Sequence, residues 1–181
     1  MRLHEIFIAT AGKNAALSKR LCEVLNLATE IERKFLVDAK KVSALNFDDE
    51  EFIAQGYLST SPTVRVRIKN NRGFLTIKSS TVGIARKEFE YEIPLDDAEE
   101  LLQLCGSHVL KKVRRKISYG GHVWEVDFFG GKLDGLILAE VELARCDEVV
   151  ELPDWVTREV SDDVRYFNSN LSLTSELPDW R

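Results

Sequence analysis

The feature that most constrains this chain is a two-residue alternation of apolar and polar side chains in eight segments from Thr29 onward. Such alternation is typical of β-strands with one buried face. The segments span residues 29–37, 51–59, 63–70, 73–79, 86–93, 109–118, 122–129 and 136–144. Asparagine and glycine separate several of them, including a hairpin signal at residues 70–73. Eight strands with such breaks predict a barrel or a sandwich.

The second face of these strands is sorted by charge. One strand presents only bases on that face, and another presents only acids; they carry Arg65, Arg67 and Lys69, and Glu88, Glu90 and Glu92. For a single strand the ordinary interpretation is a solvated face with cross-strand ion pairs. However, only two candidate helices, weakly at 40–49 and more firmly at 96–104, are available to cover eight apolar faces. We therefore expect a closed barrel with its ionic faces inside, and a short helix near 162–173.

An interior rich in both bases and carboxylates indicates a multiply charged ligand. Buried charges are costly unless they pair with each other or a ligand neutralises them. Arginine and lysine suit phosphate oxygens, and carboxylates are the hard ligands that Mg²⁺ or Mn²⁺ prefers. The pattern predicts a polyphosphate bound together with a divalent cation.

Composition excludes several classes of protein. The net charge of −5, from 30 acidic and 25 basic residues, argues against a general binder of double-stranded DNA. The sequence has no Walker A loop, HExxH or GxSxG motif, and no apolar stretch long enough for a membrane span or a signal peptide. Three dispersed cysteines, Cys22, Cys105 and Cys146, form no zinc or disulfide pattern. We expect a cytoplasmic protein with reduced thiols.

The first 27 residues form an extension in this interpretation. Residues 5–10 read as a strand and 11–14 as a turn, and a helix follows whose apolar stripe consists of Leu17, Leu21, Val24 and Leu25. We expect either the outer face of the barrel or a second copy in a homodimer to cover this stripe. The main domain then spans residues 28–175, and 176–181 are a tail.

The charged motifs resemble those of the CYTH domain, or triphosphate tunnel metalloenzyme, superfamily. Glu30, Glu32 and Lys34 match its ExExK signature. The later motifs follow in the order of the short bacterial members: Arg65-Val66-Arg67, Thr76-Ile77-Lys78, Glu88-Phe89-Glu90, Lys112-Val113-Arg114, Trp124-Glu125-Val126-Asp127, Glu140-Val141-Glu142 and Arg165-Tyr166 with Asn168. The resemblance covers about residues 28–173. It implies an α+β, mainly β fold, namely an eight-stranded antiparallel barrel with a few flanking helices.

The resemblance also implies roles for particular residues. The metal ligands would be Glu30, Glu32, Asp127, Glu140 and Glu142. The triphosphate would be bound by Lys34, Arg65, Arg67, Lys78, Arg86, Lys112 and Arg114. The catalytic set would be Glu88, Glu90, Lys34 and Arg165, in which the glutamates bind a second metal or orient water. One departure is that Val164 and Phe167 flank the late Arg-Tyr pair, where many short relatives carry lysines.

The activity that the resemblance implies is metal-dependent hydrolysis of inorganic triphosphate to diphosphate and phosphate, closest to that of short bacterial inorganic triphosphatases. One alternative is an enzyme acting on nucleoside or thiamine triphosphate, or a class IV adenylyl cyclase. Another is a non-catalytic polyphosphate or nucleotide sensor, an interpretation that Val164 and Phe167 favour.

Overall fold

The computed structural model describes residues 29–80, 83–174 and 176–178. The predicted extension of residues 1–27 and the last residues of the predicted tail lie outside the described residues. No helix in the described part of the chain is long and apolar enough to cross a membrane.

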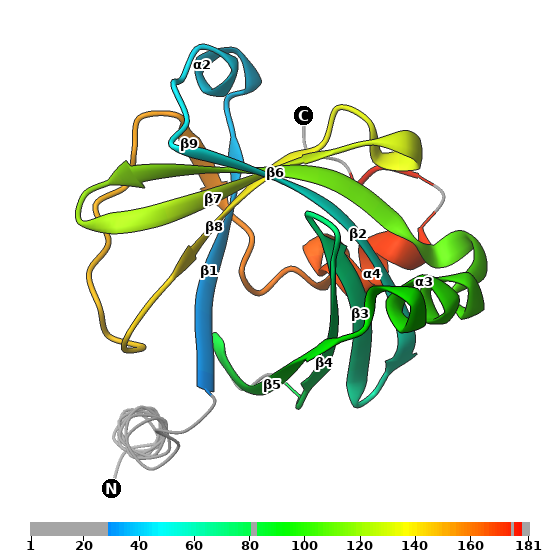
Figure 1. The fold of residues 1–181 in the computed structure, drawn as a ribbon. Coiled ribbons are helices and arrows are strands. Elements are labelled where there is room, and N and C mark those ends of the chain that lie inside the picture. Colours follow the sequence, from blue (N-terminus) through cyan, green and yellow to red (C-terminus); the bar gives the residue numbers. More distant parts are fainter. Residues whose placement is uncertain (1–28, 81–82, 175, 179–181) are drawn as a thin grey trace, which may run out of the picture.

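Eight antiparallel strands close into a barrel, as predicted (Figure 1). They are β1 (Thr29–Val37), β2 (Asp49–Thr60), β3 (Thr63–Lys69), β4 (Arg72–Lys78), β5 (Ala85–Ile93), β6 (Leu110–Tyr119), β7 (His122–Phe129) and β8 (Ile137–Glu142). Their order around the barrel is β1-β5-β4-β3-β2-β6-β7-β8, and β8 returns to β1. The β1–β5 pairing that completes the circle is short, with Thr29 opposite Lys87 and Ile31 opposite Ala85.

A ninth strand, β9 (Val156–Glu159), was not predicted from the sequence. It pairs with the last part of β1, where Phe35 lies opposite Glu159 and Val37 opposite Val156. β8 pairs with one edge of β1 from Glu32 to Leu36. β5 and β9 pair with successive parts of the opposite edge of β1.

Two helices pack on the outer face of the barrel. α3 (Leu95–Leu104), predicted at 96–104, packs Ala98 and Leu102 against Val66 of β3. α2 (Ala39–Ser43) is shorter than predicted; the Asp38 side chain caps its first turn, and Ala44 is its C-cap residue. The predicted helix at 162–173 is split by extended backbone at Phe167 into the 3₁₀ turn η3 (Val164–Tyr166) and the helix α4 (Asn168–Leu173). Two further 3₁₀ turns are η1 (Gly106–His108) and η2 (Gly131–Leu133).

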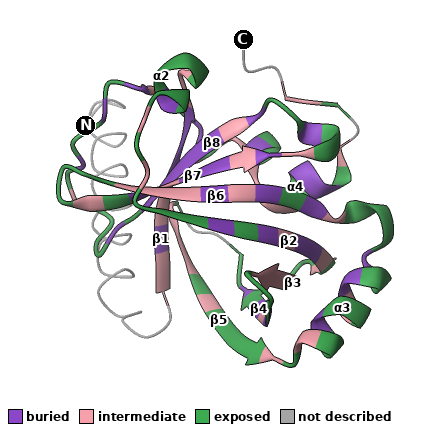
Figure 2. Cartoon of the chain, turned by 45° about the horizontal axis from the view of Figure 1, so that its top comes forward, coloured by how far each residue is buried: buried purple, intermediate pink, exposed green. Residues whose placement is uncertain are grey.

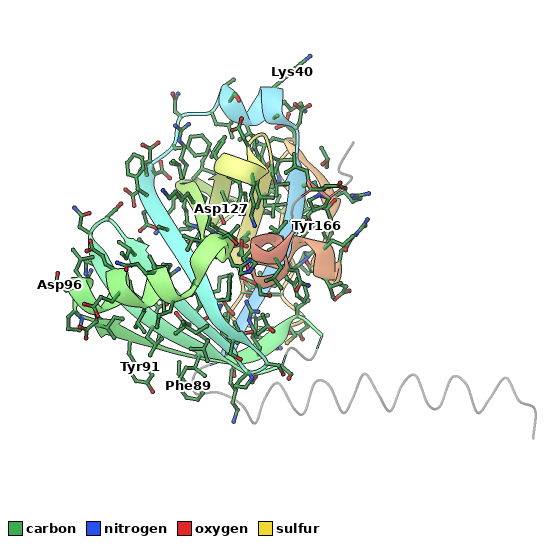
Figure 3. The ribbon with its side chains drawn as sticks, turned by 90° about the vertical axis from the view of Figure 1, so that its right-hand side faces the viewer. Lys40, Phe89, Tyr91, Asp96, Asp127 and Tyr166 are labelled. Carbon is green, nitrogen blue, oxygen red and sulfur yellow. The ribbon has the colours of Figure 1, made fainter. Side chains whose placement is uncertain are left out.

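An aromatic cluster covers the outer face of β1, β7 and β8. The ring of Trp124 lies 5.5 Å from that of Phe35 and 5.4 Å from that of Trp155, which comes from the segment before β9. The alternation of buried and more exposed residues along the barrel strands can be followed in Figure 2. On β5, by contrast, Phe89 and Tyr91 point outward and are largely exposed (Figure 3).

The inside of the barrel is ionic over only part of its depth. Leu36 follows Glu32 and Lys34 on the inward face of β1, and it belongs to a buried apolar cluster. The cluster fills one end of the barrel and consists of Leu36, Leu110, Phe129, Leu133, Leu136, Leu138, Val160, Tyr166 and Leu171. The ionic interior is therefore a cavity with an apolar floor.

Candidate active site

The inward faces of the strands enclose a cavity of about 400 Å³. Its ionic lining consists of Glu30, Glu32, Glu51, Glu88, Glu90, Glu125, Glu140 and Glu142, together with Lys34, Arg65, Arg67, Lys69, Lys78, Arg86 and Arg114. The structure thus brings together all the predicted site residues except Lys112, Asp127 and Arg165. Antiparallel pairing explains the gathering, because it places bases and acids from distant parts of the sequence side by side on the inward face.

Two arginines of β3 form one wall of the cavity. Arg65 Nη2 donates to Thr76 Oγ1 at 3.1 Å and lies 3.4 Å from Glu88 Oε1, and Arg67 Nη2 lies 2.6 Å from Glu90 Oε2. The Nε atoms of both arginines are buried and have no hydrogen-bond partner among the described residues. Buried donors normally find an acceptor. These two unused donors therefore fit an anionic ligand in the cavity.

A second ion cluster lies where β1 meets β4 and β5. Lys78 Nζ bridges Glu30 and Glu88, with 2.9 Å to an oxygen of each, and Arg86 lies 2.6 Å from Glu30 and 3.1 Å from Glu32. Burial acts to raise the pKa of Glu30, but Lys78 and Arg86 outweigh it and hold that pKa at about 2. Burial and the neighbouring Glu30 raise the pKa of Glu88. The two carboxylates therefore differ in basicity although one lysine contacts both.

The third cluster joins β1, β6 and β8. Glu140 lies between two bases, with Lys34 Nζ 2.8 Å from its Oε1 and Arg114 Nη2 2.6 Å from its Oε2. Burial opposes ionisation of Glu140, but Lys34 and Arg114 lower its pKa well below the usual range. Burial likewise acts to lower the pKa of Lys34, and Glu140 and Glu32 overcome it and raise that pKa.

Asp127 and Lys112 lie beneath the cavity rather than in its lining. Asp127 is completely buried and accepts from Arg114 Nε and Nη2, at 2.7 Å each, and from Lys112 Nζ at 2.5 Å. Figure 3 shows Asp127 in the interior of the molecule. Burial lowers the pKa of Lys112 to about 8. This geometry gives Asp127 a role in holding Arg114 in place, and it supports neither the predicted metal ligation by Asp127 nor a phosphate contact by Lys112.

Arg165 also lies away from the cavity. Its side chain is 58% exposed, and its Nη2 lies 2.5 Å from Asp163. From this part of the chain, Ser161 and, just after η3, Phe167, Asn168 and Ser169 reach the cavity. The predicted catalytic role of Arg165 therefore receives no support from its position.

Several carboxylates face each other across strand pairs. Glu32 lies opposite Glu142 on β1 and β8, and Glu125 lies opposite Glu140 on β7 and β8. Like charges in this arrangement are destabilising. Burial together with neighbouring carboxylates raises the pKa of both Glu32 and Glu142, with Glu140 acting on Glu32 and Glu30 on Glu142.

A divalent cation would relieve this repulsion. Within the described residues no three His, Cys, Asp or Glu side chains already surround one point as metal ligands, because the acids turn toward the bases. Glu140 Oε1 nevertheless has no hydrogen-bond partner in the described part of the chain, since Lys34 approaches it outside hydrogen-bonding geometry. Carboxylate oxygens are the donors that Mg²⁺ and Mn²⁺ prefer. The donor set of Glu30, Glu32, Glu140 and Glu142 therefore fits such an ion.

From the sequence, no site role was assigned to several residues of the lining. Glu51 and Tyr57 of β2 line the cavity, and so do Lys69 and Glu125. A sequence signal for Glu51 and Tyr57 of β2 was present, because Glu51, Gln55 and Tyr57 alternate with Phe52 and other outward-facing residues. No periodic pattern marks Phe167 and Asn168, which reach the cavity from an irregular segment.

The chain matches the family model of the CYTH domain over residues 28–172 and belongs to the CYTH domain family, which confirms the resemblance of its motifs. An inorganic triphosphatase of Acetivibrio thermocellus is 45% identical over 150 residues, which cover 80% of this chain and 94% of that protein. An inorganic triphosphatase of Nitrosomonas europaea is 36% identical over 156 residues, which cover 81% of this chain and 98% of that protein. A crystal structure of the inorganic triphosphatase NE1496 superposes with a TM-score of 0.60 at 31% identity, over 83% of this chain and 98% of that one.

Proposed function

We propose that this chain is a hydrolase that converts inorganic triphosphate to diphosphate and phosphate with the help of Mg²⁺ or Mn²⁺. The observation that carries the proposal is the mainly ionic lining of the cavity. Sites for organic ligands are lined mainly by apolar and aromatic side chains. Among the described residues, the apolar and aromatic side chains of the lining are those of Tyr57, Ile84 and Phe167. The two curated relatives that match most of this chain are themselves inorganic triphosphatases.

The charge balance of the cavity supports the need for a cation. Eight carboxylates outnumber seven bases by one in the lining. Inorganic triphosphate carries several negative charges, so such a cavity would repel it if it entered alone. A divalent ion held by Glu30, Glu32, Glu140 and Glu142 would reverse this balance and free Lys34 and Arg86 for phosphate oxygens. When bound, the metal would neutralise charge on the phosphate groups.

The side chains of the cavity then have distinct tasks. Arg65 and Arg67 donate their unused Nε–H groups to phosphate oxygens. Lys78 and Arg114 hold the other phosphate groups of the substrate in line for displacement. Water attacks the terminal phosphorus, the bridging P–O bond breaks, and the electron pair leaves with diphosphate. Positive groups around the leaving diphosphate stabilise the charge that develops there.

Glu88 is the better general base of the two predicted catalytic glutamates. It takes the proton of the attacking water, because burial and Glu30 raise its pKa toward the working pH. For Glu90, burial opposes ionisation but Arg67 outweighs it, and the pKa falls. A carboxylate held in this way is a weaker base, so Glu90 is assigned to orienting Arg67, which lies 2.6 Å away.

The test compares initial rates of phosphate release from tripolyphosphate, ATP and thiamine triphosphate, each with Mg²⁺ and with Mn²⁺. We expect tripolyphosphate to be hydrolysed fastest and EDTA to abolish the release. A faster release from ATP or thiamine triphosphate would show that the cavity accepts an organic group and would overturn the substrate assignment. Tight tripolyphosphate binding without any release would favour the sensor instead.

A further inference from the structure

An exposed apolar patch lies on the outer face of β4 and β5. This β4–β5 patch consists of Ile77, Phe89 and Tyr91, which are 36%, 45% and 56% exposed. Figure 3 shows Phe89 and Tyr91 pointing away from the barrel. Ile77 lies directly opposite Phe89, and Tyr91 follows Phe89 on the same face of β5. The three side chains are therefore neighbours on one surface.

The outer surface on either side of the β4–β5 patch is covered. On one side, the apolar cluster beneath α3 extends to Leu75 and Ile93. On the other side, the aromatic cluster of β1, β7 and β8 extends to Ile31 and Ala85, which face each other where β1 pairs with β5. The patch is thus an uncovered gap between two packed surfaces, and an exposed apolar gap of this kind indicates a docking site.

The chain that precedes the described residues joins the barrel beside this gap. Thr29, the first residue of β1, lies opposite Lys87 of β5. Lys87 and Phe89 are two positions apart on the same outward face of that strand. Leu25 precedes Thr29 by four positions, and four residues span at most about 14 Å. The predicted apolar stripe of residues 17–25 is therefore tethered within reach of the β4–β5 patch.

The stripe and the patch also match in size. The four apolar side chains of the stripe fall on one face of the predicted helix, and at 1.5 Å per residue the distance from Leu17 to Leu25 is about 12 Å. On the barrel, Val64, Ile77 and Phe89 form a cross-strand row over β3, β4 and β5. Two strand spacings make this row about 10 Å wide. One face of the helix can therefore cover the row.

The small area of the patch favours a segment of the same chain over a second copy. Phe89 and Tyr91 each expose on the order of 100 Å², about half of what an aromatic side chain can bury. A standard interface between two proteins needs about 800 Å² from each partner. A tethered segment needs less, because the tether gives it a high effective concentration. We propose that the apolar stripe of residues 17–25 docks on the β4–β5 patch of its own chain.

The test is a double-mutant cycle in the full chain with Leu21→Ser, Phe89→Ser and the double variant, read as melting temperatures at two protein concentrations. Each single substitution should lower the melting temperature by roughly 3 to 6 °C, the shift for losing part of one buried apolar side chain. The double variant should melt little below the lower of the two, because both changes remove the same contact. Phe52→Ser is the matched control, since Phe52 is 63% exposed on the outer face of β2, and it should leave the melting temperature nearly unchanged.

The other outcomes would overturn the proposal. If Phe89→Ser leaves the melting temperature unchanged, or if the double variant shows the sum of the two single shifts, the stripe does not dock on this patch. If the coupling between Leu21 and Phe89 weakens on dilution, the stripe covers the patch of a second copy. Coupling that is equal at both concentrations is the expected result. None of these measurements involves substrate, so the proposed function and this inference can fail separately.

Discussion

Asp127 offers a sharp test of how the cavity is built. The family resemblance implies a metal ligand at this position, and the structure shows a completely buried carboxylate between two buried bases. The substitution Asp127→Asn keeps the size of the side chain and removes its charge. Lys112 and Arg114 would then lose their shared counterion, although Arg114 would retain Glu140.

The expected loss of stability follows from these contacts. Removing one partner of a buried ion pair typically costs about 3 to 5 kcal/mol, because the remaining charge stays buried without a counterion. Glu140 keeps part of the interaction with Arg114, and Lys112 can release its proton, since its pKa is already lowered to about 8. We therefore expect a loss at the lower end of this range, about 3 kcal/mol of the free energy of unfolding. For a domain of this size that corresponds to a fall in melting temperature of roughly 6 to 12 °C.

The assay is urea unfolding followed by circular dichroism, with and without saturating Mg²⁺. Asp154→Asn is the control, because Asp154 forms an exposed ion pair with Lys41 and should cost less than about 1 kcal/mol. The reasoning predicts the same loss for Asp127→Asn with and without the metal. If the variant is as stable as wild type without Mg²⁺ and differs only in its presence, then Asp127 is a metal ligand and the structural role is refuted.

Three further predictions address the cavity and the chain before it. Glu88→Gln should lower kcat about 10²- to 10⁴-fold and remove the acid limb of the pH profile of kcat/KM. We expect that limb above pH 4.5, because the pKa of Glu88 is raised and activity grows as Glu88 loses its proton. An unchanged limb would assign the role of general base to another group. Arg65→Ala should weaken tripolyphosphate binding in calorimetry by about 1.5 to 3 kcal/mol, whereas Arg72→Ala, which removes an exposed base of β4, should leave it unaffected. A chain that starts at Ala28 should keep its activity, because every proposed site residue comes after Ala28. The shortened chain should melt at a lower temperature or change its oligomeric state, since residues 17–25 carry an apolar stripe that needs to be covered. Complete inactivity of that shortened chain in a folded state would show that the extension reaches the cavity.

The sequence was informative about which face of each strand a residue occupies, and much less about depth along the barrel. Glu125 and Asp127 share the inward face of β7, and the alternation treats them alike. In the structure Glu125 lines the cavity, while Asp127 lies one step closer to Phe129 and the apolar end. A period of two specifies the face of a strand, but the distance from the apolar floor depends on the register between strands.

Short and irregular segments were the other limit. β9 has only four residues, and its pairing with β1 joins positions more than a hundred residues apart, so no local pattern identifies it. The helical pattern near the C-terminus gave no sign of the extended backbone at Phe167, which directs Phe167 and Asn168 to the cavity and leaves Arg165 at the surface. By contrast, α3 was predicted because Pro94 and two acidic residues mark its start.

The most direct test of the central claim, that an ionic barrel cavity hydrolyses inorganic triphosphate with a divalent metal, is a phosphorus NMR time course of tripolyphosphate with the full chain. We predict that diphosphate and phosphate appear in equal amounts in the presence of Mg²⁺ or Mn²⁺, that EDTA stops their formation, and that Glu32→Gln, which removes one proposed ligand, nearly abolishes it. Equal rates with and without metal, or a Glu32→Gln variant within threefold of wild type, would contradict the claim.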